Sequence, residues 1–225
     1  MKRFAVFIAL TMSIFLLLNC SEDSTGPTEE PSYQLFPNGY FSTGFREEYS
    51  LVGSSQSGTQ FTGTHLELTQ SPVTFGGQQT APVTIRDEWA DNLGGSFLTS
   101  TAYFYSTDGD NRQLLGIQDQ LTTGILTPTT STAMPVSAKI GDSGQVGVYS
   151  DGQGNTLTQT WELQAGENGR AKMVLANQVR DANNTLVTDG NVTFQIDEGG
   201  TRYGMTIFFD LKILGDPVNW TGTKL

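Results

Sequence analysis

The chain has 225 residues, with 23 Asp and Glu against 12 Lys and Arg, and its formal net charge is −11. Such an acidic balance argues against nucleic-acid binding, because a protein needs a cationic surface to displace counterions from phosphates. The single Cys excludes an intramolecular disulfide framework and a Cys-rich metal site. The length predicts one sizeable domain or two small ones, and 13 Phe, 7 Tyr and 3 Trp argue against full disorder.

The first twenty residues have the pattern of an export signal. A basic start, Met1-Lys2-Arg3, precedes an apolar run over residues 4–18 that is too short to span a bilayer. The run ends in Leu17-Leu18-Asn19-Cys20, which resembles the lipobox of bacterial lipoproteins. The resemblance implies that residues 1–19 are a signal peptide, and that Cys20 carries palmitate or similar acyl chains on its sulfur and its amine.

This resemblance predicts a lipid-anchored protein of the bacterial cell envelope. Ser21 stands where an Asp would retain a lipoprotein in the inner membrane, so the outer membrane is expected in a Gram-negative cell, on its periplasmic or surface face. Residues 21–34 contain four acids, two prolines and no aliphatic side chain. We therefore expect residues 20–34 to form the lipidated Cys and a disordered acidic tether.

Residues 35–225 are predicted to form an all-β domain. The clearest pattern is the alternation of Met205, Ile207, Phe209, Leu211 and Ile213 with more polar residues, which is typical of a strand with one buried face. The segments 156–165 and 97–106 have similar patterns, and Gly- and Asn-rich turns separate them. We predict about ten antiparallel strands in a sandwich or an open barrel.

A tandem duplication is one interpretation of the domain. Residues 81–117 align without a gap with residues 171–207, and the shared positions include Phe104 with Phe194. The repeats would span 45–117 and 145–214, with a connector at 118–144. Similar hairpins without common ancestry explain the alignment equally well.

Two stretches, YSLVGSSQSGTQFTGT and IGDSGQVGVYSDGQGNT, extend the resemblance into the mature chain. They resemble parts of uncharacterised Thr/Gly-rich β-sheet lipoproteins of bacteria. The resemblance implies a secreted β-domain, and it implies no activity.

Catalytic residues are not evident from the sequence. The one histidine, His65, alternates with Leu66 and Leu68, so we expect it on the solvent face of its strand with Glu67. No Gly-x-Ser-x-Gly motif indicates a hydrolase. A polysaccharide hydrolase would need two carboxylates close together in a cleft, and the sequence does not give their separation.

Two kinds of binding residue are candidates. Oxygen-rich turns suit calcium, and the weak candidate ligands are Asp108, Asp110, Asp181 and Asn183. Aromatic side chains could form a surface for a sugar or a lipid, and the candidates are Tyr103, Tyr105, Trp89 and Trp161. If Phe104 is a core residue, the two tyrosines beside it face the other way and form an exposed patch.

The sequence therefore predicts a lipid-anchored, non-enzymatic binding or structural module with no cofactor and no nucleic-acid partner. The first alternative is a carrier that holds a lipid or another apolar ligand in a curved sheet. The second alternative is an envelope polysaccharide hydrolase.

Overall fold

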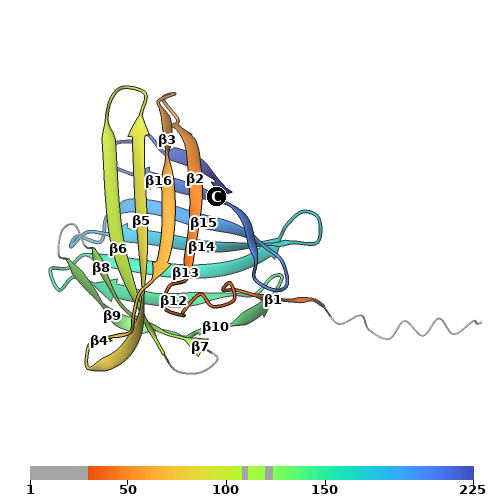
Figure 1. Ribbon diagram of the computed structural model, residues 1–225. Helices are drawn as coiled ribbons and strands as arrows, with labels where there is room; N and C mark the ends of the chain where they lie inside the picture. Colours follow the sequence, from red (N-terminus) through yellow and green to blue (C-terminus); the bar gives the residue numbers. More distant parts are fainter. Residues whose placement is uncertain (1–29, 108–110, 120–123) are drawn as a thin grey trace, which may run out of the picture. The chain divides into compact units, whose positions relative to one another are not determined.

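The computed structural model describes residues 30–107, 111–119 and 124–225, and within these ranges it contains strands and no helix (Figure 1). The prediction of an all-β, antiparallel fold is confirmed. The predicted signal peptide, Cys20 and most of the predicted tether lie outside the described residues.

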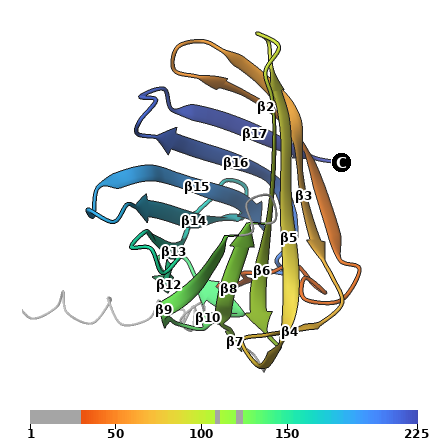
Figure 2. The same cartoon turned by 90° about the vertical axis from the view of Figure 1, so that its left-hand side faces the viewer.

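In the described part of the chain, one antiparallel sheet of thirteen strands dominates the fold, and twelve of its strands close into a barrel (Figures 1 and 2). Each barrel strand pairs with the barrel strands before and after it in the sequence, and the first pairs with the last. The barrel strands are β2 (Arg46–Ser55), β3 (Gln60–Thr69), β5 (Gln78–Asp91), β6 (Ser96–Ser106), β8 (Leu114–Asp119), β9 (Ile125–Ser131), β12 (Ser143–Ser150), β13 (Thr156–Ala165), β14 (Ala171–Arg180), β15 (Leu186–Ile196), β16 (Arg202–Leu211) and β17 (Val218–Lys224).

Closure through the pairing of β2 with β17 is what distinguishes this sheet from the expected sandwich or open barrel. Val52 lies opposite Thr221 at this seam, although the two residues are far apart in the sequence. An even number of antiparallel strands lets a simple up-and-down order close on itself, and closure pairs the two edges that an open sheet would expose.

Among the residues that the structure describes, five short strands lie outside the barrel wall. They are β1 (Ser32–Gln34), which pairs with β11 (Ser137–Lys139), β7 (Asn111–Arg112), which pairs with β10 (Met134–Pro135), and β4 (Val73–Phe75), which pairs with β5.

Two of the predicted segment boundaries differ from those in the structure. The last residues of the predicted tether, 32–34, form β1 with Tyr33 buried, and the predicted connector 118–144 contains the barrel strand β9.

The alternation along the strands sets the interior of the barrel. Met205 and Phe194 lie opposite each other on β16 and β15 and are buried, as the period-two pattern predicts. Ile213 differs from its prediction, because it follows the end of β16 and is exposed. One of the predicted Gly- and Asn-rich turns, at residues 167–169, is confirmed, with Asn168 and Gly169 at φ of 55° and 73°.

The two ends of the barrel are unlike. We call the base the end with the turns at residues 166–170 and 197–201, and the mouth the end with the loops at residues 92–95, 151–155 and 181–185. The segment 35–45 crosses the base and buries Leu35, Phe36 and Tyr40 among the side chains of the wall. Twelve strands enclose a wider space than their own side chains fill, and this segment, which we call the plug, fills it at the base.

The two proposed repeats each correspond to five consecutive barrel strands, β2, β3, β5, β6 and β8 in the first and β12 to β16 in the second. Their aligned side chains do not share a face, however. Phe194 points into the barrel, where it contacts Arg202, whereas Phe104 lies outside and stacks on Phe75 of β4. A β-bulge between Val179 and Arg180 shifts the second register by one residue, which reverses the faces.

Candidate functional site

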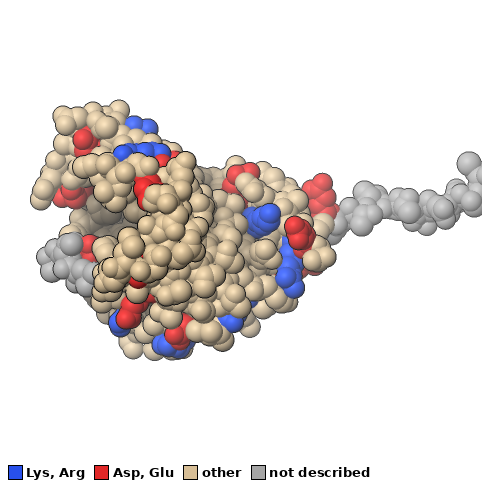
Figure 3. All heavy atoms as spheres, turned by 90° about the horizontal axis from the view of Figure 1, so that it is seen from above, with Lys and Arg blue, Asp and Glu red and all other residues tan. Residues whose placement is uncertain are grey.

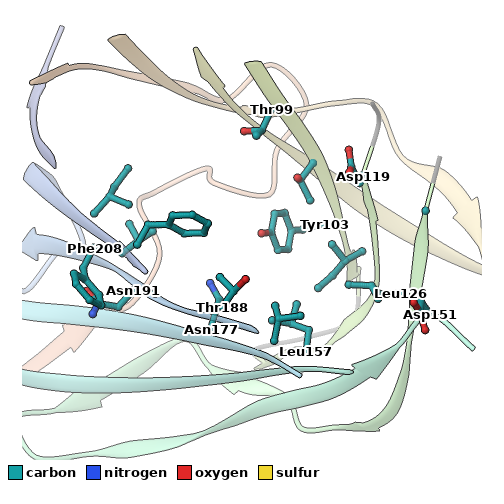
Figure 4. Close-up of a pocket in the computed structure, with 18 of the residues that line it drawn as sticks. Thr99, Tyr103, Asp119, Leu126, Asp151, Leu157, Asn177, Thr188, Asn191 and Phe208 are labelled. Atoms are coloured by element: carbon teal, nitrogen blue, oxygen red, sulfur yellow. The ribbon is translucent and has the colours of Figure 1, made fainter. Parts of the chain in front are cut away.

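A cavity of about 820 Å³ occupies the mouth of the barrel. Its wall comes from both halves of the chain, with Tyr103 and Ile117 on one side and Leu157, Asn177 and Val192 on the other. Figure 4 shows Tyr103 pointing from β6 into this space, opposite Leu157 and Asn177. In Figure 3 the same face of the molecule is hollowed, and uncharged residues form most of the wall.

The wall is mostly apolar and carries a few polar groups. Inward positions along β8, β15 and β16 supply Ile117, Val192 and Ile207, which lie farther from the mouth than Asp119 and Thr188. A cavity of this size and character is typical of sites that hold a small molecule, because the apolar wall provides affinity and the polar groups provide orientation.

Beside this cavity begins a chain of charged side chains that runs to the base, buried at its centre and more exposed at its two ends. Asp87 lies opposite Thr99, which lines the cavity, and its Oδ1 is 2.6 Å from Nδ1 of His65. Nε2 of His65 is 3.3 Å from Oε1 of Glu67. Nη1 of Arg202 then donates to Oε2 of Glu67 at 2.8 Å and to Oε2 of Glu47 at 3.3 Å. Lys224 completes the chain by donating to Oε1 of Glu47 at 2.6 Å, so each buried acid faces a base.

The charged groups in this series shift each other's pKa values. Burial alone would raise the pKa of Glu67, but the charge of Arg202 and the hydrogen bond and charge of His65 lower it to about 2. Burial alone would lower the pKa of His65, but its hydrogen bonds to Asp87 and Glu67 raise it to about 9. At neutral pH His65 is therefore a cation that donates from both ring nitrogens.

The prediction that His65 and Glu67 face solvent was wrong. Each has only 2% of its surface exposed, and both point into the barrel, whereas Leu66 and Leu68 are half-buried on the outside. The interior of β3 accepts charged side chains because Arg202, which is 135 residues away from Glu67 in the sequence, supplies the compensating charge.

The four aromatic candidates do not form one surface. Tyr103 lines the cavity, and Tyr105 is buried nearer the base against Phe36 and Phe41 of the plug. Both tyrosines point inward, and Phe104 is the residue on the outer face, so the expected exposed patch was wrong. Burial, with the nearby charges of Asp87 and Glu67, raises the pKa of Tyr103 to about 12, so its hydroxyl stays protonated.

The two tryptophan candidates have different surroundings. Trp89 contacts Phe61, Phe97 and Trp220, with the Trp89 and Trp220 ring centroids 5.2 Å apart. Trp161 is buried in the core.

The side of the cavity to which β14 contributes was not predicted from the sequence. The signal that could have indicated it is the amide of Asn177, which lies on the otherwise apolar face of Met173, Leu175 and Val179.

Of the candidate calcium ligands, Asp181 has a structural role in its own turn. Asp108 and Asp110 lie outside the described residues. The carboxylate of Asp181 accepts the backbone N–H groups of Asn183 and Thr185 at 2.9 Å and 2.8 Å, which stabilises the turn between β14 and β15. Within residues 30–107, 111–119 and 124–225, no group of three or more His, Cys, Asp or Glu side chains could hold a metal ion.

Comparison with protein-family models, with curated proteins and with solved structures found no significant match. In the part of the chain that the structure describes, no helix is long and apolar enough to cross a bilayer.

Proposed function

We propose that this protein is a carrier that binds one small apolar or amphipathic molecule in the mouth of its barrel. The observation that carries the proposal is the cavity of about 820 Å³, whose wall is mostly apolar and comes from both halves of the chain. A purely structural module would gain stability from filling this space, since packing contacts are lost around a void. The carrier is therefore favoured over the structural module that the sequence suggested first.

The proposal includes the envelope anchor. Lipidation of Cys20 is supported by the Leu-Leu-Asn-Cys motif and by the absence of any other Cys in the sequence. Two or more acyl chains give stable anchoring, whereas one gives only marginal binding. Mass spectrometry of the protein purified from membranes, compared with a Cys20→Ser variant, tests this part separately.

Binding of the neutral fluorescent probe N-phenyl-1-naphthylamine tests the carrier itself. We expect saturable fluorescence enhancement with one site per chain. Val192→Trp should abolish it, because Val192 points into the cavity and a larger side chain would occupy it. The matched control is Thr193→Trp, which places the same ring on the opposite face of the same strand. A probe that binds both variants equally would refute the cavity as the site.

A further inference from the structure

We infer that the cavity selects its ligand by charge, taking an amphiphile with a cationic amine head group in preference to one with a carboxylate. This inference rests on the proposed function and names the class of ligand. Among the described residues that line the cavity, two are acidic, Asp119 and Asp151, and none is Lys, Arg or His.

The basic groups inside the barrel are already committed to acids. His65 lies between Asp87 and Glu67, and Arg202 lies between Glu47 and Glu67. Both bases are buried, with side-chain exposures of 3% and 1%. Neither can therefore pair with an anion in the cavity without leaving a buried carboxylate uncompensated.

The bases nearest the mouth are also engaged. Arg180 donates to the backbone oxygen of Asn184 at 3.0 Å, and Lys212 donates to Asp210. The two internal stretches outside the described residues have the sequences Asp-Gly-Asp and Gln-Leu-Thr-Thr, so neither contains a base. A carboxylate head group would then enter a partly desolvated site without a cation, which is unfavourable.

One of the two acids of the wall lies in a loop and the other on a barrel strand. Asp151 begins the loop 151–155 at the mouth. Asp119 is at the mouth end of β8 and points inward opposite Thr101. We therefore place the amine beside Asp119 and the hydrocarbon chain deeper, against Ile117, Val192 and Ile207.

The test is displacement of N-phenyl-1-naphthylamine by decylamine, decanol and decanoate at pH 7.5, each below its micelle concentration. The three competitors share one chain length and differ in head-group charge. We expect decylamine to bind most tightly and decanoate at least about tenfold more weakly than decylamine, the scale of one charge pair in a partly desolvated site. Decanoate that competes as well as decylamine would overturn the inference while leaving the carrier intact. A protein that binds neither the probe nor decanol would overturn both.

A variant series assigns the selectivity to one residue. Asp119→Asn should reduce the advantage of decylamine over decanol about fivefold or more. Glu88→Gln removes the same charge from the outer face of β5, where Glu88 is exposed beside Arg86. This variant should leave the advantage of decylamine over decanol unchanged. Equal effects of the two variants would show that net charge, and not Asp119, sets the preference. Retained decanol binding shows that each variant is folded.

Discussion

The guanidinium of Arg202 is buried between the carboxylates of Glu47 and Glu67, and its Cζ lies 3.8 Å from the ring centroid of Phe194. Arg202→Met would leave two buried acids without their common partner. We expect a loss of about 3–5 kcal/mol in the free energy of unfolding, measured by urea denaturation. Adding Glu67→Gln should recover part of this loss, because it removes one of the two buried charges that lose Arg202 as a partner.

Arg86→Met is the matched control, since the ion pair of Arg86 with Glu88 is exposed. Its effect should stay within about 0.5 kcal/mol. A similar small effect of Arg202→Met would show that the buried chain of charges contributes little to stability.

The same chain of charges predicts how stability depends on pH. The pKa of His65 is raised from 6.5 to about 9, so its stabilising contribution is complete below about pH 6.5 and is lost as the pH rises through about 9. The pKa of Glu67 is lowered from 4.5 to about 2, so its contribution is complete above about pH 4.5 and is lost as the pH falls through about 2.

Urea denaturation between pH 6 and pH 10 measures the alkaline loss. In the His65→Gln variant the glutamine side chain does not titrate. The free energy of unfolding of this variant should therefore fall less than that of the wild type over this pH range. Parallel pH profiles for the two proteins would contradict the assignment of the loss to His65.

At the scale of single residues, the sequence predicts which side chains share a face better than it predicts which face is inside. The alternation of Leu66 and Leu68 with His65 and Glu67 is real, but the charged pair is the buried one. The partner that makes this favourable, Arg202, is distant in the sequence, and no local pattern reveals it.

Among the elements, the seam between β2 and β17 depends on a glycine. A Cβ atom added to Gly53 would lie 2.5 Å from Cδ1 of Trp220 and even closer to the backbone oxygen of Asn219. Backbone cannot move aside as a flexible side chain can, so Gly53→Ala should separate the first and last strands of the barrel. We expect a loss of about 1–3 kcal/mol in the free energy of unfolding.

Ser50→Ala, on the exposed outer face of the same strand, is the control for this seam. Urea denaturation that gives the same midpoint for Gly53→Ala and Ser50→Ala would show that the seam tolerates a side chain at this point.

The elements were predictable to the extent that they are local. Period-two patterns and turn residues locate β13, β16 and the turns that follow β13 and β15. The pairing of β2 with β17 and the packing of the plug depend on contacts between distant segments, which the sequence pattern does not encode. The cavity follows from these two features, and for that reason its far wall was missed.

For the whole molecule, ligand binding and folding are linked. A ligand that binds only the folded barrel should stabilise it by about 2.7 kcal/mol at a concentration of one hundred times its Kd. For a domain of this size, that free energy corresponds to a rise in Tm of roughly 5–10 °C. Calorimetry with N-phenyl-1-naphthylamine measures the rise, and Val192→Trp should show none. A rise of the same size in that variant would place the ligand outside the cavity.

The plug at the base has a kinetic consequence. Because the segment 35–45 fills one end of the barrel, a bound molecule and its replacement must use the same opening. The occupant has to depart before the newcomer can enter, so the rate of replacement should equal the rate of departure and should not increase with the concentration of the newcomer. The residence time of the bound molecule is then controlled by whatever loosens the mouth, and crowding by competing molecules does not shorten it.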